Sequence, residues 1–466
     1  MLNPYRFFDP DEYVRKIAFE LYQEVKGMPI LSPHGHVNPS LLAYNEPFPD
    51  PTELIILPDH YIYRLLYSQG ISMESLGIPA RDGTEVEQDH RKIWKIFADH
   101  YYLFAGTPTG IWLNHELSEV FGIEENLDSE NAMAIYDELS EKLKSEEFLP
   151  RRLFERFGIE VLTTTDGAVD SLEHHQKIQL SEWKGRVIPC FRPDAVIDIR
   201  RPDWNRQIEA LSEASRIMIN SFPSFIAALE NRREFFKSMG AVSTDQGILS
   251  PYTNELDPPE VENIFQRALK WKSTEEDGYL FTAHMLMEMA RMSIEDGMVM
   301  QIHPGSFRNH NQALFDRFGY DKGADIPVQT EYTRNLHPLL NKFGNDRRFT
   351  LVVFTLDEST YSRELAPLAG HYPAMKLGAP WWFHDSIQGM LRFREHVMET
   401  ASIYNTVGFT DDTRAFPSIP ARHDLSRRMD SNFLARMVAR HTITMNQAKI
   451  MNMELAYKLA KRTYNL

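Results

Sequence analysis

Two histidines one residue apart, His34 and His36, follow a short apolar run near the N-terminus. On a β-strand, residues at i and i+2 point to the same face, so these two imidazoles could share one cation. The chain contains 17 histidines, and chance alone gives roughly half an H-x-H pair in such a chain. The pair therefore needs a partner elsewhere before it indicates a metal site rather than a strand that reaches the surface.

A carboxylate that could complete this site lies in the sequence 411-DDTR-414, at the last of the predicted strands. The first and eighth strands are neighbours in a closed barrel, which would place Asp411 or Asp412 beside the histidines. Two histidines and one carboxylate leave coordination positions open for a substrate, as is typical of a catalytic metal ion. We expect one divalent ion, with zinc the leading candidate and manganese, iron or cobalt as alternatives.

Arginines follow two of the predicted strands and suit an anionic substrate. Arg192 and Arg414 offer guanidinium donors in a fixed geometry, which match a carboxylate or a pair of sugar hydroxyls. The net charge of −16 would repel an anion, so local cations are needed to bind one. The alternative is that each arginine only pairs with a neighbouring carboxylate, Asp194 or Asp412.

Other polar residues also stand where predicted strands end, and catalytic groups of a (β/α)₈ barrel lie at such ends. These residues are Asp166, Asp194, Asp245, His303 and Asp357. His60 and Tyr61 lie just beyond the first strand, where an inserted subdomain could fold over the barrel mouth and a phenol could move a proton. The alternatives are that strands simply give way to polar loops and that Tyr61 is a packing residue.

The elements that must position these residues are short β-rich segments that lead into helical patterns. They span residues 29–36, 159–166, 187–194, 239–245, 298–305, 349–357, 374–383 and 406–414. A strand followed by a helix eight times is the pattern of a (β/α)₈ barrel, and apolar strands buried on both faces fit it. A doubly wound open sheet is the competing architecture, because periodicity alone does not exclude it.

One interval interrupts this alternation. Between residues 41 and 155 the patterns are helical and no barrel strand is evident, so we expect a helical insertion subdomain after the first strand. Residues 1–40 would then form an N-terminal helix and the first strand. Residues 156–466 would form the remainder of the barrel and its closing C-terminal helices.

The composition excludes several classes of protein. A hydrophobic fraction of 42% and a charged fraction of 25% are those of a globular chain, not of a mostly disordered one. The single cysteine, Cys190, excludes an intrachain disulfide and favours a cytoplasmic location. We expect no secretory signal, and no apolar run approaches the roughly 20 residues that cross a bilayer. The acidic charge argues against a nucleic-acid or membrane partner.

Longer motifs extend along most of the chain. They are 34-HGH-36, 59-DHYIYR-64, 163-TTTDGAVDSLEHHQ-176, 191-FRPD-194, 298-MVMQIHPGSFRNHNQ-312, 380-PWWFHD-385 and 411-DDTRAFPSIPARHD-424. In these motifs the chain resembles uronate isomerase (glucuronate isomerase), a branch of the amidohydrolase superfamily. The resemblance implies a distorted (β/α)₈ TIM-type barrel with a helical insertion. It implies an aldose–ketose isomerase that interconverts D-glucuronate with D-fructuronate and D-galacturonate with D-tagaturonate.

The resemblance also implies roles for individual residues. His34, His36 and Asp412 would hold one divalent metal ion, with Asp412 preferred to Asp411 because the D-x-R spacing of the family falls on it. The carboxylate of the hexuronate and its neighbouring hydroxyl would bind this metal.

Catalysis would use Asp412 together with Tyr61, which would contact the aldehyde oxygen, and Arg414, which would contact the hydroxyls near the reacting end. His60, Arg192 and His303 match positions that face the substrate.

The chain departs from the pattern of the family in three places: Ser32 replaces an acidic residue, Gln246 replaces a histidine, and the eighth-strand region has one extra acidic residue, so that Asp411 could compete with Asp412 for the metal. Two other functions stay open at this point. One is a mononuclear metal-dependent hydrolase of the same superfamily, and the other is a sugar-acid binding protein without catalysis. We expect a homo-oligomer, with the helical insertion as a possible subunit interface.

Overall fold

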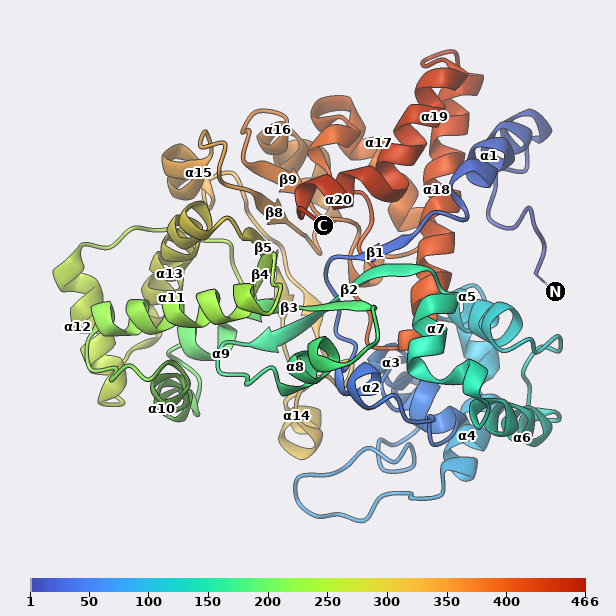
Figure 1. Cartoon of the computed structure of the whole chain (residues 1–466), viewed down its shortest axis with the longest axis horizontal. Coiled ribbons are helices and arrows are strands. Elements are labelled where there is room, and N and C mark those ends of the chain that lie inside the picture. Colours follow the sequence, from blue (N-terminus) through green and yellow to red (C-terminus); the bar gives the residue numbers. More distant parts are fainter. Residues whose placement is uncertain (1) are drawn as a thin grey trace.

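A curved sheet of parallel strands forms the centre of the molecule (Figure 1) in the computed structural model, which describes residues 2–466. The strands are β1 (Ile30–Ser32), β2 (Ile159–Gly167), β3 (Arg186–Arg192), β4 (Ser243–Ile248), β5 (Val299–Pro304), β8 (Leu351–Val353) and β9 (Met375–Leu377). They lie side by side in chain order, β1-β2-β3-β4-β5-β8-β9. A doubly wound sheet would reverse its strand order at a switch point, so this order is that of a barrel.

The eighth predicted strand, residues 406–414, is not a regular strand. Thr406 forms an isolated parallel bridge with Leu377 of β9. Further along, the backbone amide of His36 donates to the carbonyl of Thr413 at 2.9 Å. The segment therefore connects β9 to the end of β1 and closes the ring with few ladder hydrogen bonds.

The backbone of this closing segment explains its irregularity. Gly408 has φ of 82° and Asp412 has φ of 43°, both in the left-handed region that an extended strand cannot contain. The fold is thus the distorted (β/α)₈ barrel that was expected, with its distortion concentrated in the eighth segment.

Helices alternate with the strands on the outside of the barrel. They are α8 (Glu173–Leu180), α9 (Asp194–Ile197), α10 (Trp204–Ser215), α11 (Phe222–Ser238), α12 (Pro258–Leu269), α13 (Glu275–Asp296), α14 (Gln312–Phe318), α15 (His337–Phe343), α16 (Ala366–Ala369) and α17 (Ile387–Ala401). Local sequence sets their ends: α13 begins with a capping box between Thr274 and Asp277 and ends at Gly297, whose φ is 77°. After β5, the antiparallel pair β6 (Ser306–Phe307) and β7 (Ile326–Pro327) forms a small excursion.

The segment between β1 and β2 is helical. It contains α2 (Ser40–Tyr44), α3 (His60–Ser68), α4 (His90–Asp99), α5 (Pro108–His115), α6 (Ala132–Leu143) and α7 (Pro150–Arg156). These helices gather on one side of the molecule, at the lower right of Figure 1. Their apolar residues share one buried cluster with the barrel, in which Leu153 of α7 accompanies Leu162 of β2 and Val187 of β3.

The N-terminal helix packs against the C-terminal helices on the outside of the barrel. α1 (Glu12–Val25) lies beside α18 (Ile419–Ala439) and α19 (Met445–Met453), and α20 (Leu459–Thr463) follows (Figure 1). A buried cluster that includes Leu21, Leu425 and Leu455 joins them. Among the residues that the structure describes, no helix is both long and apolar enough to span a membrane.

Candidate active site

A cavity of about 710 Å³ opens where the barrel strands end. Its lining includes His34 and His36 after β1, Arg192 at the end of β3, His303 of β5 and Asp412 of the closing segment. Residues from the helical insertion, among them Pro58, Asp59, His60 and Tyr61, form part of the same wall. The cavity therefore occupies the mouth of the barrel, where such folds carry their catalytic groups.

His34, His36 and Asp412 converge at this mouth. The Nε2 atoms of His34 and His36 lie 3.4 Å and 3.2 Å from Oδ1 of Asp412. That carboxylate oxygen is inaccessible to water and has no hydrogen-bond partner among residues 2–466. One ligand atom of each residue lies within 4.8 Å of the others, so the set could hold a metal ion. Two imidazole nitrogens and a carboxylate oxygen suit a divalent transition metal ion.

The structure separates the two candidate carboxylates of the closing segment. Asp412 faces the histidines, whereas Asp411 points away and accepts a hydrogen bond from Nε2 of His423 at 3.2 Å. The side chain of Asp411 is buried outside the cavity lining. Asp412 is therefore the carboxylate that lies within reach of a metal held by His34 and His36.

Burial and mutual attraction set the charges of these groups. Burial opposes ionisation of Asp412, yet His34 and His36 lower the pKa of its carboxyl well below the usual range. Burial likewise opposes protonation of His34, but the charges of Asp245 and Asp412 raise its pKa well above the ordinary value. The pKa of His36 falls to about 4, chiefly because of burial. A bound metal ion would thus replace a proton on His34.

A second group of ligand atoms adjoins the first. Nδ1 of His303 donates to Oδ1 of Asp245 at 2.5 Å, and the His303 ring stacks on His34 with centroids 4.7 Å apart. His34, Asp245 and His303 also lie close enough together to hold a metal ion. Arg192 faces the same carboxylate, with Nε 3.5 Å from Oδ2 of Asp245, and donates to Asp194 at 2.7 Å.

His60 and Tyr61 reach the cavity from the first turn of α3. Asp59 caps this helix and accepts a hydrogen bond from the Tyr61 amide at 2.8 Å, which fixes both residues at the mouth. Burial raises the pKa of Tyr61 well above its ordinary value, so the phenol keeps its proton near neutral pH. Burial, followed by the charge of Arg414, lowers the pKa of His60 to about 3, and His60 is therefore neutral.

The comparisons with known proteins agree on one family. A sequence model described as glucuronate isomerase matches residues 9–464. The chain belongs to the glucuronate isomerase family. A uronate isomerase from Nostoc punctiforme is 54% identical over 100% of this chain and 98% of its own length. The crystal structure of a glucuronate isomerase from Caulobacter crescentus has 51% identity and a TM-score of 0.98, and covers 100% of this chain and 97% of its own. A crystal structure of a uronate isomerase from Thermotoga maritima has 27% identity and a TM-score of 0.93, and covers 100% of this chain and 99% of its own.

Membership of the glucuronate isomerase family bears on the open alternatives. The relatives match the whole chain, including the barrel, the insertion and the closing helices. The expected fold and the expected isomerase activity are both confirmed, and the rival hydrolase is not favoured.

The two replacements in this glucuronate isomerase family member, Ser32 and Gln246, lie beside the cavity rather than in its lining. Oγ of Ser32 and Nδ1 of His34 are both buried without a hydrogen-bond partner. Gln246 is buried within β4, where its amide donates to Thr244 at 3.1 Å. Neither replacement therefore removes a side chain from the cavity wall.

Some residues of the cavity wall were not predicted. Asp321 belongs to the loop between α14 and β7, and its Oδ2 lies 3.1 Å from Nη2 of Arg414. Arg422 of α18 pairs with Asp385, and Trp381 and Trp382 line the wall as well. The motifs 380-PWWFHD-385 and 411-DDTRAFPSIPARHD-424 contain most of these residues, and a second arginine inside the latter motif was the signal that could have found Arg422. No sequence signal marks Asp321, because it belongs to a loop.

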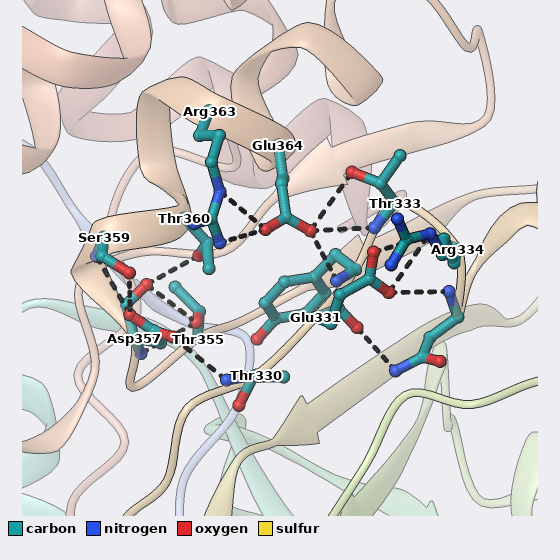
Figure 2. A network of polar contacts seen from close by, with 12 residues as sticks. Thr330, Glu331, Thr333, Arg334, Thr355, Asp357, Ser359, Thr360, Arg363 and Glu364 are labelled. Carbon is teal, nitrogen blue, oxygen red and sulfur yellow. Dashed lines mark hydrogen bonds and ion pairs between the residues drawn. The ribbon is translucent and has the colours of Figure 1, made fainter.

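Two predicted strand-end residues lie elsewhere. Asp166 accepts a hydrogen bond from Thr164 at 2.7 Å beside His175 and is absent from the cavity lining. Asp357 belongs to a polar network at the end of β8, which Figure 2 shows, and accepts from the amide of Thr330 at 3.0 Å. It also caps a short helical turn by accepting from the amide of Ser359 at 3.1 Å. The bland interpretation, polar residues that end a strand, fits both.

Proposed function

We propose that this isomerase converts D-glucuronate to D-fructuronate, and D-galacturonate to D-tagaturonate, by moving a proton from C2 to C1 through an enediol. The observation that supports the proposal is the convergence of His34, His36 and Asp412 in a cavity that Tyr61 and Arg414 also line. This set combines a cation site with an ionised carboxylate, a protonated phenol and a guanidinium. A pure binding site would not need such an acid–base set.

The chemistry requires a base and hydrogen-bond donors. A C–H group beside a carbonyl is a weak acid, and the enediolate that forms on its ionisation needs stabilisation. In our proposal the base at C2 is Asp412, whose carboxylate is ionised, or a substrate alkoxide that Asp412 deprotonates. The proton taken from C2 is delivered to C1. Tyr61 passes its proton to the aldehyde oxygen O1 and regains one from the O2 hydroxyl, while Arg414 stabilises O2 and the neighbouring hydroxyls.

The remaining residues would bind and orient the substrate. Arg192 and His303 line the inner wall, and neutral His60 lies beside Tyr61, with ring centroids 4.6 Å apart. A divalent metal ion held by His34, His36 and Asp412, which we propose to be zinc, would anchor the substrate carboxylate and the adjacent hydroxyl.

Two further proposals concern the molecule as a whole. We propose that it is a homo-oligomer with the helical insertion at its interface, since the insertion carries exposed aromatic side chains at Tyr44, Tyr67 and Tyr102. We also propose that it acts in the cytoplasm, where its single buried thiol, Cys190, would stay reduced. Sedimentation of the purified protein would test the first of these proposals.

The activity is tested by incubating the purified, zinc-loaded protein with D-glucuronate in deuterated water and following the sugar by NMR. We expect a ketose product that carries deuterium at C1. Loss of a group from the sugar would indicate a hydrolase instead. An unchanged sugar that binds with measurable affinity would indicate a binding protein.

A further inference from the structure

Arg422 is a buried cation at the rim of the candidate site. It lies in the first turn of α18, and its side chain is 3% exposed. Nη1 donates to Oδ2 of Asp385 at 2.9 Å and to the backbone carbonyl of Asp411 at 3.1 Å. Arg422 therefore bonds the residue that directly precedes the proposed base, Asp412.

The bond to Asp411 bears on the backbone of Asp412. With φ of 43°, Asp412 adopts a left-handed conformation that is unfavourable for a residue with a side chain, and neighbouring contacts must hold it there. The start of α18 supplies two of these contacts. Arg422 bonds the carbonyl of Asp411, and the adjacent His423 bonds its carboxylate. Together they fix the turn that directs Asp412 toward His34 and His36.

The same guanidinium also packs against the wall that carries Tyr61. Its Cζ lies 3.6 Å from the ring centroid of Trp112 and 5.8 Å from that of Tyr61. The Trp112 and Tyr61 rings meet edge to face with centroids 5.7 Å apart. The indole nitrogen of Trp112 is buried without a hydrogen-bond partner, so stacking on Arg422 is the main polar contact that orients this ring.

We infer that Arg422 is a positioning residue that couples Asp412 to Tyr61. It acts through the carbonyl of Asp411 on one side and through the ring of Trp112 on the other. Loss of this planar cation, which bonds Asp411 through Nη1 and Ser418 through Nε while its plane stacks on Trp112, releases the turn at Asp412 and the wall behind Tyr61 together. Lysine keeps the charge but cannot reproduce this geometry. The inference rests on the proposed function for its effect on turnover, whereas its effect on Asp412 is independent of any activity.

The competing explanation is that Arg422 only neutralises Asp385. Burial raises the pKa of the Asp385 carboxyl to about 7, and Arg422 opposes this effect. If neutralisation were its whole role, Asp385→Asn would leave the site as it is in the wild type. Arg422 would then be dispensable in that variant, because no charge would remain for it to neutralise. Both explanations predict that Asp385→Asn alone leaves the site intact. They differ for Asp385→Asn combined with Arg422→Met, which only the neutralisation explanation predicts to behave as the wild type.

The test uses the full-length protein with the substitutions Arg422→Lys, Arg422→Met, Asp385→Asn, and Asp385→Asn combined with Arg422→Met. Arg233→Met is the matched control, because Arg233 is equally buried and pairs with Asp296 at 2.6 Å but lies outside the cavity lining. Zn²⁺ affinity is measured by competition with a chromophoric chelator. Turnover of D-glucuronate gives kcat and KM, and circular dichroism reports folding.

We expect both Arg422 substitutions to lower Zn²⁺ affinity and kcat by about 10- to 100-fold, with a smaller change in KM. The double substitution should not recover either value, while Asp385→Asn and Arg233→Met should retain the wild-type affinity. Wild-type affinity and kcat in Arg422→Lys would overturn the inference, as would full recovery in the double variant. If Arg422→Met does not fold, Arg422→Lys decides. If the wild type fails to isomerise D-glucuronate, the proposed function falls, and Zn²⁺ affinity still decides the role of Arg422.

Discussion

At the scale of single residues, the central feature is that neighbouring carboxylates have different partners. Asp411 accepts from His423, whereas Asp412 faces the Nε2 atoms of His34 and His36. The left-handed backbone at Asp412 turns the two side chains into different surroundings. One residue thus serves the packing of α18, and the other serves the cavity.

This difference predicts opposite results for two conservative substitutions. Asp412→Asn should lower Zn²⁺ affinity by at least about 10-fold, because an amide oxygen carries no charge to oppose that of the metal. Asp411→Asn should retain the affinity and lose only some stability. Metal analysis after dialysis measures both, and a larger loss of zinc in Asp411→Asn would contradict the assignment.

Removal of the metal is expected to abolish turnover without unfolding the barrel. His34, His36 and Asp412 lie on elements whose core is apolar and buried, so a chelator should leave circular dichroism unchanged. Addition of Zn²⁺ should restore activity. Full activity after exhaustive chelation, with no metal detected, would contradict a metal-dependent mechanism.

At the scale of elements, the sequence predicted the strands better than it predicted their closure. Apolar runs such as 298–305 identified β5 because a barrel strand is buried on both faces and ends in a polar residue, here His303. The segment 406–414 was expected to be an equal strand. Its geometry depends on Gly408 and on Asp412, whose φ is held by contacts from α18, and no local pattern reports such contacts.

The residues of the candidate site that stand on regular strands were predictable for the same reason. The prediction missed the residues whose position depends on contacts between distant segments. His34, His36, Arg192 and His303 follow regular strands, so their common location could be inferred from the topology. Asp321 and Arg422 reach the cavity from a loop and from a helix, where position depends on tertiary packing. The spacing of residues in the sequence does not show that Asp321 or Arg422 lies at the cavity.

The junction of α5 with α18 contains a histidine, 13% exposed at its side chain, that should make stability depend on pH. Burial lowers the pKa of His115 to about 4 in the folded protein, even though Asp424 lies nearby, against about 6.5 in the unfolded chain. As the pH falls, His115 is protonated in the unfolded chain before it is protonated in the folded protein. Its contribution to the free energy of unfolding is therefore complete above pH 6.5 and is lost as the pH falls toward 4.

His115→Gln should therefore reduce the loss of stability on acidification. Between pH 7 and pH 5 the wild type should lose up to about 2 kcal/mol more free energy of unfolding than the variant. Urea denaturation at both values measures the difference. His371→Gln, at an exposed histidine, is the control and should behave as the wild type. Equal pH dependence of wild type and His115→Gln would contradict the prediction.

At the scale of the whole molecule, the helical insertion and the barrel share a core. Leu153 of α7 is fully buried in the cluster that includes Leu162 and Val187 of the barrel strands. An insertion with its own separate core would instead unfold independently. The shared cluster predicts that the two parts lose their structure in one cooperative transition.

Leu153→Ala should shift that single transition, lowering the free energy of unfolding by about 2 to 5 kcal/mol through lost burial and a cavity. Leu180→Ala is the control, because Leu180 of α8 is 89% exposed. Calorimetry of both variants distinguishes the outcomes. A new low-temperature transition in Leu153→Ala, with the barrel transition unmoved, would show that the insertion is an independent subdomain.

The role of Asp412 as the base is tested most directly by the exchange of the C2 proton of D-glucuronate with solvent. NMR in deuterated water follows this exchange in the zinc-loaded wild type and in Asp412→Asn, with circular dichroism and metal content measured on the same samples. We expect wild-type protein to exchange the C2 proton during turnover and folded, metal-containing Asp412→Asn to show no exchange. Exchange at a near-native rate in Asp412→Asn would contradict the account, because another group would then be the base.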